Sequence, residues 1–582
     1  MKVSDYIVQF LSVLGVDKIY GLQGGAITHI VDSIERNDKI QFIPVYHEQT
    51  AAIAAEGYAR ESKNLGVAIA TSGPGATNLI TGIANAFFDS IPVLYITGQV
   101  NTYEFKYDKS VRQQGFQETN IVEIVKPITK YAKVVDRVED IKEALEKAVE
   151  IALSKRMGPV LIDIPMDVQR GDISIPENKT IVKKPLNSVY QVGTYKNDQI
   201  EYYSELINNA VSPVILLGGG ARSSNQELIE SFVEMTQIPV VVTLMGKGLF
   251  DEFNTLFCGM IGSYGNRCAN MIIANADVVI ALGSRLDTRQ TGTNIKSFVE
   301  SGKILHIDID QNELDGNRLE NRLSIKMSID DFIQDVQVAR NTRDNWLKYV
   351  LPTVNKYNQK QELARNQVYD FPYKLVEQLN HMSHKIDAYC VDIGHHQMIA
   401  AQILTLNKEQ EFYTSGGHAP MGYAIPAAVG VAMASPNKQI IAIVGDGCFH
   451  ISTQALMLIS QYQLSIKIIV INNHSLGMIT QFQNQYFDGV LSGTVKEKGY
   501  LVPDLESIAN AYALKYISIS DKETIPSQAS KLSEFINSKG NGILEARCSE
   551  LTTVIPKLSV GSPIENPYPQ LPEAILKKAM FR

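Results

Sequence analysis

The sequence has few of the features that mark disulfide-stabilised, membrane or nucleic-acid-binding proteins. Its 582 residues include only five cysteines, which lie far apart without a CxxC pair, so neither a disulfide framework nor a zinc site is predicted. No stretch reaches the roughly 18 apolar residues of a membrane span. The net charge of −8 is not concentrated in a block, which argues against a nucleic-acid or anionic-membrane surface. We expect a soluble, cytoplasmic protein that acts on small molecules.

The composition is otherwise that of an ordinary globular protein, with 45% hydrophobic and 20% charged residues. A chain of this length is too long for one hydrophobic core, so several domains are predicted. The first 16 residues have apolar side chains at helical spacing and are interrupted by Asp5 and Gln9. We interpret them as an amphipathic helix and not as a signal peptide.

Short apolar runs that end in Gly, Asn, Asp or Ser and precede helical patterns recur along the chain. They are 18–21, 66–72, 93–98, 160–164, 213–218, 278–283, 304–308, 439–444 and 467–471. This alternation predicts parallel α/β architecture. Two polar stretches, 169–188 and 346–372, interrupt it and are interpreted as connectors. The predicted fold has three doubly wound parallel-sheet domains and a proline-containing tail that drapes over a surface, with the bounds 1–170, 190–345, 370–550 and 551–582.

The strongest candidate site lies in the third domain, where two strand-like runs each end on a polar side chain. Asp446 follows the run 439–444, and Asn473 follows the run 467–471. The carboxyl ends of parallel strands are the ligand-binding edge of an open α/β sheet. Mg²⁺ takes oxygen ligands and shares them with phosphates, so a carboxylate, an amide oxygen and a backbone carbonyl suit it. We therefore predict a magnesium site at Asp446, Asn473 and Ser475.

The residues beside Asp446 suit a diphosphate. Gly445 and Gly447 let the backbone approach the ligand, and a helix expected from about Cys448 offers its N-terminal amides. A Gly-Asp-Gly turn alone is most often structural. The Asn-Asn pair that ends the next strand favours cofactor binding here.

Gly-Asp-Gly followed by Asn-Asn resembles the diphosphate-binding motif of thiamine-diphosphate enzymes, and nearly the whole chain resembles the catalytic subunits of the acetolactate synthase (acetohydroxyacid synthase) family. Further matching segments are GGA at 24–26, HEQ at 47–49, TSGPGATN at 71–78, GFQETN at 115–120, TSGG at 414–417 and LGM at 476–478. The resemblance implies thiamine diphosphate and Mg²⁺ as cofactors. It also implies a pyrimidine-binding domain, a central flavin-type domain and a diphosphate-binding domain, in that order.

Within this resemblance, Glu48 matches the catalytic carboxylate that hydrogen-bonds the cofactor's pyrimidine ring and promotes removal of the thiazolium C2 proton. On its own, a carboxylate that opens a helical run is also explained by the helix macrodipole. Met421 matches the apolar residue that keeps the cofactor bent, although a methionine often only fills a core gap. Gln117 and Arg289 are expected to orient a carboxylate or carbonyl, and Phe482 to shape the acceptor pocket.

The resemblance implies further contacts to thiamine diphosphate from the first and third domains. They are Gly25, Pro74, Asn78, Gly394, His395, His396, Gly417, Ala419, Met421, Gly445, Gly447 and Cys448. Ala419 matches the position whose backbone carbonyl holds the aminopyrimidine, and 394–396 matches a loop around the diphosphate. A histidine pair in a loop is as often solvated surface.

A second cofactor is implied for the middle domain. The glycines at 218–220 follow a strand but lack GxGxxG spacing, so alone they are a weak nucleotide signal. The resemblance adds flavin-contacting segments, and FAD is expected at Gly218, Gly219, Thr243, Leu244, Met245, Gly283, Arg285, Asp287, Arg289, Asp308 and Ile309. Asp308 is expected to accept hydrogen bonds from adenosine hydroxyls, and Arg285 to meet the diphosphate.

Several positions depart from the synthase pattern. Phe482 replaces a tryptophan, Ser263 and Tyr264 replace a Met-His pair, Thr288 replaces an aspartate, and 418–420 replaces a Leu-Gly-Ala segment. These changes cluster where acceptor specificity is expected, so donor chemistry is predicted more securely than acceptor identity.

The expected activity is decarboxylation of pyruvate, a 2-oxo acid, and transfer of its two-carbon acetyl unit to a second carbonyl, with acetolactate as the default product. One alternative keeps the donor but uses a specialised acceptor such as a keto sugar. Another is a pyruvate oxidase or decarboxylase, in the first case with a redox-active flavin. The resemblance also implies a homodimer or homotetramer in which Glu48 of one protomer and Asp446 of another share an active site, and it leaves room for a regulatory subunit.

Overall fold

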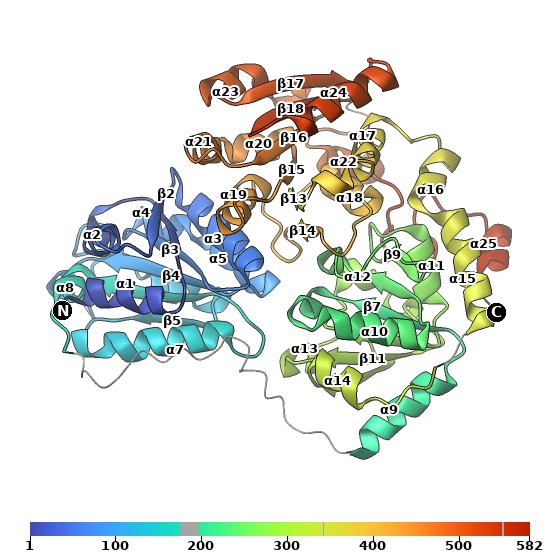
Figure 1. The fold of residues 1–582 in the computed structure, drawn as a ribbon, viewed down its shortest axis with the longest axis horizontal. Helices are drawn as coiled ribbons and strands as arrows, with labels where there is room; N and C mark the ends of the chain where they lie inside the picture. The colour runs from blue at the N-terminus through green and yellow to red at the C-terminus, as the bar shows by residue number, and fades with distance from the viewer. Residues whose placement is uncertain (175–196, 341–342, 550–551, 582) are drawn as a thin grey trace.

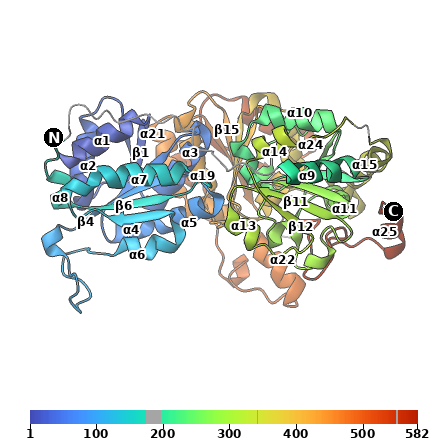
Figure 2. The same cartoon turned by 90° about the horizontal axis from the view of Figure 1, so that it is seen from below.

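Three six-stranded parallel sheets, each covered by helices, make up the computed structural model, which describes residues 1–174, 197–340, 343–549 and 552–581 (Figure 1). The predicted fold class is confirmed. Half of the strands are buried along their whole length, which is why they read as continuous apolar runs in the sequence. The first and middle domains lie at opposite ends of the molecule in both views, and the third domain joins them (Figure 2).

Each sheet has a central point at which the strand order reverses. The first sheet has the order β2-β1-β3-β4-β6-β5, the second β12-β11-β10-β7-β8-β9 and the third β14-β13-β15-β16-β18-β17. The strands of the first are β1 (Lys18–Gly21), β2 (Gln41–Pro44), β3 (Gly66–Ala70), β4 (Val93–Gln99), β5 (Tyr131–Val134) and β6 (Val160–Pro165). Those of the second are β7 (Pro213–Leu217), β8 (Val240–Val242), β9 (Phe257–Met260), β10 (Val278–Leu282), β11 (Lys303–Asp308) and β12 (Arg322–Lys326). Those of the third are β13 (Ala388–Val391), β14 (Glu411–Tyr413), β15 (Ile440–Gly445), β16 (Ile466–Asn472), β17 (Lys515–Ser520) and β18 (Gly542–Arg547). The reversal points β1/β3, β10/β7 and β13/β15 are where such sheets bind ligands.

The helices follow the domain order. In the first domain they are α1 (Val3–Val13), α2 (Thr28–Glu35), α3 (Glu48–Ser62), α4 (Pro74–Asn78), α5 (Ile80–Asp89), α6 (Ile121–Val125), α7 (Ile141–Leu153) and α8 (Met166–Arg170). In the middle domain they are α9 (Asn197–Asn209), α10 (Gln226–Thr236), α11 (Arg267–Ala274), α12 (Thr288–Thr291), α13 (Gln311–Asp315) and α14 (Ile329–Asp335). The rest are α15 (Asp344–Tyr357), α16 (Gln359–Arg365), α17 (Phe371–Asn380), α18 (His395–Ile403), α19 (Ala424–Ala434), α20 (Asp446–Ile451), α21 (Leu456–Gln461), α22 (Gly477–Tyr486), α23 (Leu505–Ala511), α24 (Ile525–Asn537) and α25 (Glu573–Ala579). None of the described helices combines the length and the apolar character that a bilayer crossing requires.

The first and third domains are joined by α3 and α19, which lie against each other at the centre of Figure 1. Two glycines allow their backbones to approach closely. A Cβ atom on Gly57 would lie 2.3 Å from the carbonyl oxygen of Ala427, and one on Gly430 would lie 2.0 Å from that of Ala54. Any larger residue at these positions would push the two domains apart.

The interpretation of 346–372 as a plain connector is wrong, because most of it folds into α15 and α16. Trp346 is fully buried and its indole N–H donates to the carbonyl of Pro213 over 3.0 Å. Val350, Tyr357 and Leu363 are buried with it. Their spacing places them on the inner faces of the helices, while most of the charged and amide side chains that suggested a connector are exposed; Gln359 and Glu362 are the buried exceptions. The other predicted connector, 169–188, lies mostly outside the described residues.

The C-terminal tail packs against the middle domain. The guanidinium of Arg267, which is fully buried, donates to the carbonyl of Pro567 over 3.0 Å. The backbone of Leu558 donates to the carbonyl of Ser263 over 2.7 Å. These bonds bring residues 557–560 of the tail to the space between the middle and third domains.

Candidate functional site

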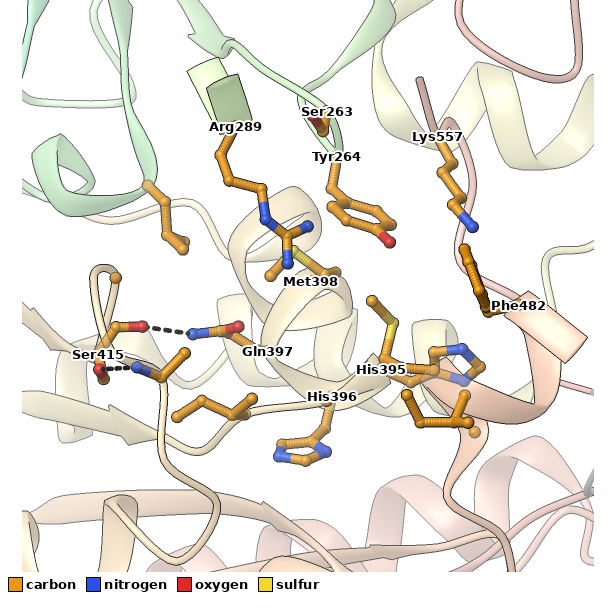
Figure 3. A pocket seen from close by; sticks show the side chains of 18 of the residues that line it. Ser263, Tyr264, Arg289, His395, His396, Gln397, Met398, Ser415, Phe482 and Lys557 are labelled. Carbon is orange, nitrogen blue, oxygen red and sulfur yellow. Dashed lines mark hydrogen bonds between the residues drawn. The ribbon is translucent and has the colours of Figure 1, made fainter. Parts of the chain in front are cut away.

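A cavity of about 630 Å³ lies between the middle and third domains (Figure 3). Its third-domain wall is built from the residues that follow β13, β15 and β16, and its middle-domain wall from those that follow β8, β9 and β10. Residues 557–560 of the tail close its outer end. The cavity therefore opens at the reversal point of the third sheet, where the sequence predicted a cofactor.

The predicted magnesium ligands meet at this edge. Asp446, Asn473 and Ser475 are all buried and all line the cavity. Asp446 Oδ1 accepts hydrogen bonds from the backbone N–H of Gly447 and from the hydroxyl of Tyr500, over 2.7 and 2.8 Å. Its Oδ2 is buried without a partner among the described residues. Burial also raises the pKa of Asp446, and both observations fit a carboxylate that has a cation as its missing partner.

The backbone beside Asp446 leaves no room for side chains. A Cβ atom on Gly445 or on Gly394 would lie within 2.9 Å of the His396 ring, and one on Gly447 would lie 2.8 Å from the Tyr500 hydroxyl. Gly394 also has a φ of +152°, which favours glycine. Such a surface lets a diphosphate approach the N-terminal amides of α20.

Two histidines form the next part of the wall (Figure 3). His395 and His396 open α18 and are buried, so the alternative of solvated surface does not hold. Burial lowers the pKa of His395 to about 4 and that of His396 to about 3, so both rings are neutral near pH 7. His395 Nε2 lies 2.9 Å from Gln481 Oε1, whereas His395 Nδ1 and His396 Nε2 have no partner among the described residues. Neutral imidazoles of this kind can donate hydrogen bonds to phosphate oxygens.

The loop before α19 brings the remaining third-domain candidates together. Ala419 has a φ of +57°, and its backbone N–H donates to Ser415 Oγ over 2.9 Å. Ala419, Met421 and Cys448 line the cavity, whereas Gly417 lies just outside its lining. The backbone N–H of Gly417 instead donates to the carboxylate of Asp89 in the first domain over 2.8 Å.

The first-domain candidates form a separate cluster at the β1/β3 reversal point. Asn78 Nδ2 donates to Glu48 Oε2 over 2.9 Å, and Glu48, at the start of α3, is buried. Gln117 has a φ of +66° and lies against Gly73, just before Pro74. No described residue of this cluster, which also includes Gly25, belongs to the lining of the cavity in the same chain.

The middle-domain candidates divide into two groups. Thr243, Leu244, Met245, Arg285, Asp287 and Arg289 line the cavity, whereas Gly218, Gly219, Gly283, Asp308 and Ile309 do not. A Cβ atom on Gly218 would lie 2.3 Å from the carbonyl oxygen of Gly283, so these glycines allow the ends of β7 and β10 to pack closely. Burial raises the pKa of Asp308 to about 6. The lining group provides a wall with an Arg285–Asp287 ion pair of 3.1 Å, which suits a polar dinucleotide.

Four of the positions that depart from the synthase pattern lie together at the outer end of the cavity, whereas 418–420 lies in the loop before α19. Ser263, Tyr264, Thr288 and Phe482 are among its lining residues, and Phe482 is 44% exposed in the single chain. The Phe482 and Tyr486 rings lie 4.8 Å apart. These side chains make the outer chamber largely aromatic.

Sequence reasoning missed three residues of this site. Tyr500 bonds Asp446, Gln481 bonds His395, and Lys557 enters the outer chamber from the tail. None belongs to a recognisable local motif, and each reaches the site only through the tertiary fold. The sequence shows the residue types of their segments, and these do not indicate that the segments approach the site.

Comparisons with known proteins agree with this geometry. Three family models match: the N-terminal TPP binding domain of thiamine pyrophosphate enzymes over 1–124, their central domain over 200–336 and their C-terminal TPP binding domain over 392–546. The acetolactate synthase large subunit of Cyanidium caldarium is 34% identical, covering 94% of this chain and 93% of the relative. That of Lactococcus lactis subsp. lactis is 34% identical, covering 96% and 94%. The acetolactate synthase isozyme 1 large subunit of Escherichia coli K12 is 33% identical, covering 96% of each.

Proposed function

Because this chain belongs to the thiamine pyrophosphate enzymes, and among them to the family of the acetolactate synthase large subunits, we propose that it decarboxylates pyruvate and transfers the two-carbon unit to a second carbonyl compound. The single observation that carries this proposal is the buried, unpaired Oδ2 of Asp446, which faces the cavity beside Asn473. A metal-bound diphosphate balances the charge of the Asp446 carboxylate and occupies the glycine-lined space beside it.

When bound, thiamine diphosphate supplies a thiazolium that accepts the electron pair left behind as carbon dioxide departs from a 2-oxo acid. In this proposal Asp446, Asn473 and the Ser475 carbonyl hold the magnesium ion. His395 and His396 donate to the diphosphate without adding positive charge, because their low pKa values keep the rings neutral.

Glu48 provides the carboxyl group that shares a proton with the aminopyrimidine, held in place by its bond to Asn78. Since Glu48 lies outside the cavity of its own chain, we place it in the cavity of a second protomer. The active enzyme is then a homodimer, or a homotetramer made of two such dimers, and a monomer is inactive.

FAD is proposed for the middle-domain wall at Thr243 to Met245, Arg285 and Asp287. Arg289 and Gln117 orient the acceptor, and Phe482 with Tyr264 shapes its pocket. We place the enzyme in a reducing cytoplasm, which five free, buried cysteines support. Because its relatives are named large subunits, a smaller regulatory subunit is a proposed partner.

The decisive experiment is to incubate the purified protein with thiamine diphosphate, Mg²⁺, FAD and pyruvate alone, and to identify the product by NMR. Acetolactate is expected. Acetaldehyde or acetate would identify a decarboxylase or an oxidase, and turnover only with an added carbonyl compound would identify a specialised acceptor. Asp446→Asn serves as the inactive control, and the exposed Asp521→Asn as the matched variant that keeps activity.

A further inference from the structure

Gln117 has a backbone conformation that residues other than glycine rarely adopt. Its φ of +66° lies in the left-handed region, where such a residue is strained and stays only if its surroundings hold it. One side of Gln117 lies against Gly73, where an added Cβ atom would lie 2.9 Å from the Cβ atom of Gln117. The neighbouring residues of the loop must hold the rest of its conformation.

Two side chains hold the part of the loop that follows Gln117. The carboxylate of Glu118 accepts hydrogen bonds from the backbone N–H groups of Lys106 and Gln114, both over 2.8 Å, and so closes the loop on itself. The side-chain amide of Gln99 donates to the backbone carbonyl of Thr119 over 2.8 Å. Gln99 belongs to β4, so its bond ties the loop to the first sheet.

A buried carboxylate fixes the orientation of the Gln99 amide. Gln99 Nε2 also donates to Asp163 Oδ2 over 2.9 Å, while Gln99 Oε1 accepts the backbone N–H of Val100 over 3.0 Å. Thr97 Oγ1 donates to Asp163 Oδ1 over 2.7 Å. Thr97 and Gln99 lie in β4 and Asp163 in the neighbouring strand β6, and all three are buried (Figure 2). Each polar atom of the Gln99 and Asp163 side chains has a partner, so the network is satisfied in this arrangement.

The carboxylate of Asp163 is costly where it lies. Burial raises its pKa to about 7, although the bonds from Thr97 and Gln99 lower it. A buried charge of this kind often stabilises a fold less than an apolar side chain of similar volume does. Since Gln99 connects Asp163 to the loop of Gln117, a role in placing that loop accounts for the carboxylate.

We propose that Gln99, oriented by Asp163, is a positioning residue that holds Gln117 in its strained conformation and so places the acceptor for carbon–carbon bond formation. This inference rests on the proposed function, in which Gln117 orients the acceptor. Loss of carbon dioxide from pyruvate needs no oriented acceptor, whereas the following step does. In that step the two-carbon unit forms a bond to the acceptor's carbonyl carbon, and the carbonyl oxygen takes up a proton. If the acceptor is misplaced, the two-carbon unit takes up a proton instead and leaves as acetaldehyde.

The test compares the two fates of the two-carbon unit. The holoenzyme is incubated with pyruvate, and carbon dioxide, acetaldehyde and carboligation product are measured. Gln99→Met keeps the length of the side chain but removes both of its N–H donors. We expect the ratio of acetaldehyde to carboligation product to rise about tenfold or more, which corresponds to about 1.4 kcal/mol. The rate of carbon dioxide release should stay within about twofold, whereas simple loss of folded protein would lower all three quantities together.

Asp163→Asn keeps the shape of the network and removes its charge, so the ratio should rise by a smaller factor of about three. Asp136→Asn, at an exposed aspartate of the same domain, is the matched control and should leave the ratio unchanged. An unchanged ratio in Gln99→Met overturns the proposal, and Asp163→Asn decides it in the same way if Gln99→Met does not fold. A rise with Gln99→Met alone refutes the part assigned to Asp163.

A double variant shows whether Gln99 acts through Gln117. If it does, Gln99→Met combined with Gln117→Ala gives the same ratio as Gln117→Ala alone, because the group that Gln99 positions is already absent. A further rise in the double variant would show that Gln99 acts by another route, and it would overturn the proposal.

Hydrogen–deuterium exchange separates this inference from the proposed function. The backbone N–H groups of Gln114, Gly115 and Glu118 are hydrogen-bonded within the loop, so their exchange reports without turnover how firmly the loop is held. If the wild-type holoenzyme forms no carboligation product but these groups exchange at least about tenfold faster in Gln99→Met, the proposed function fails and the positioning role stands. Equal exchange in both proteins refutes the positioning role. The melting temperature of each variant confirms that it is folded.

Discussion

Glu48→Gln exchanges one atom of a buried side chain and removes its ability to share a proton. The glutamine carbonyl can still accept the 2.9 Å bond from Asn78, so the contact persists while its charge assistance is lost. That change costs about 1 kcal/mol, which corresponds to a few degrees or less in melting temperature. The loss of a positioned acid–base group lowers turnover by a factor of about 10² to 10⁴. Glu48→Gln should therefore keep nearly the wild-type melting temperature and lose most of its turnover.

The assay is acetolactate formation at saturating cofactor, accompanied by thermal unfolding. Glu123→Gln, an exposed glutamate in the first turn of α6, is the matched control and should change neither quantity. Near-normal turnover by Glu48→Gln would refute the assignment of Glu48. A collapse of the melting temperature would show instead that the carboxylate is needed for the fold at the start of α3.

The same variant tests whether the site is shared between chains. Co-expression of Glu48→Gln with Asp446→Asn gives mixed dimers. If Glu48 serves the partner's cavity, each mixed dimer has one intact site, and a random mixture recovers about a quarter of the wild-type activity. If each site belonged to one chain, both sites of the mixed dimer would be damaged, and the mixture would stay inactive.

Three further outcomes are expected. Tyr500→Phe removes a donor to Asp446 and should weaken Mg²⁺ affinity by about 10- to 100-fold, as measured by metal titration of cofactor binding. Gly430→Ala places a Cβ 2.0 Å from the carbonyl of Ala54 and should lower the free energy of unfolding by about 1–3 kcal/mol in denaturant melts. Burial raises the pKa of Asp163 from 3.8 to about 7. Since the pKa of Asp163 is higher in the folded protein than in the unfolded one, its contribution to the free energy of unfolding is full below pH 4. That contribution, about 4 kcal/mol in all, is lost as the pH rises through 7. Asp163→Asn should lack this pH dependence.

The parts of the fold that the sequence predicted well are those determined by local patterns. Parallel strands buried on both faces appear as continuous apolar runs, so 439–444 and 467–471 matched β15 and β16 to within one residue. The polar residue after each run had to lie at the carboxyl edge of the sheet. Asp446 and Asn473 were therefore predicted from the chain itself, before any likeness to other proteins was used.

Predictions failed where composition was used in place of periodicity. The stretch 346–372 is rich in charged and amide residues, which suggested a connector. Trp346 and Val350 nevertheless recur at helical spacing, and they bury one face of α15 against the middle domain. A helix needs only one apolar stripe, so its average composition is a poor guide to whether it packs.

Tyr500 and Lys557 could not be predicted for a different reason. The hydroxyl of Tyr500 lies within 2.8 Å of Asp446 only because the chain between α22 and α23 folds back over the edge of the sheet. Lys557 reaches the cavity because the tail pairs with itself and with Ser263. A pattern confined to neighbouring residues cannot report either approach.

The contacts of α3 connect two parts of the predicted site, Glu48 and the loop that carries Ala419, which appear as separate motifs in the sequence. The first residue of α3, Glu48, does not belong to the lining of the cavity of its own chain. Two turns later Glu56 pairs with Arg60 over 2.7 Å, and Arg60 pairs with Asp89 over 3.0 Å. Asp89 in turn accepts hydrogen bonds from the backbone N–H groups of Gly416 and Gly417. These bonds fix the loop that carries Ala419 into the cavity.

In the proposed dimer one helix therefore positions the carboxylate of one active site and the pyrimidine-binding loop of the other. Such a helix must be rigidly placed, because a shift of its axis would displace both groups at once. The close backbone approach at Gly57 and Gly430 provides that rigidity, since no side chain separates the two backbones at these contacts. The buried Glu56–Arg60–Asp89 network adds directional bonds to the contact, and breaking one member would leave the others charged and unpaired. The geometry thus makes the domain contact part of the active site.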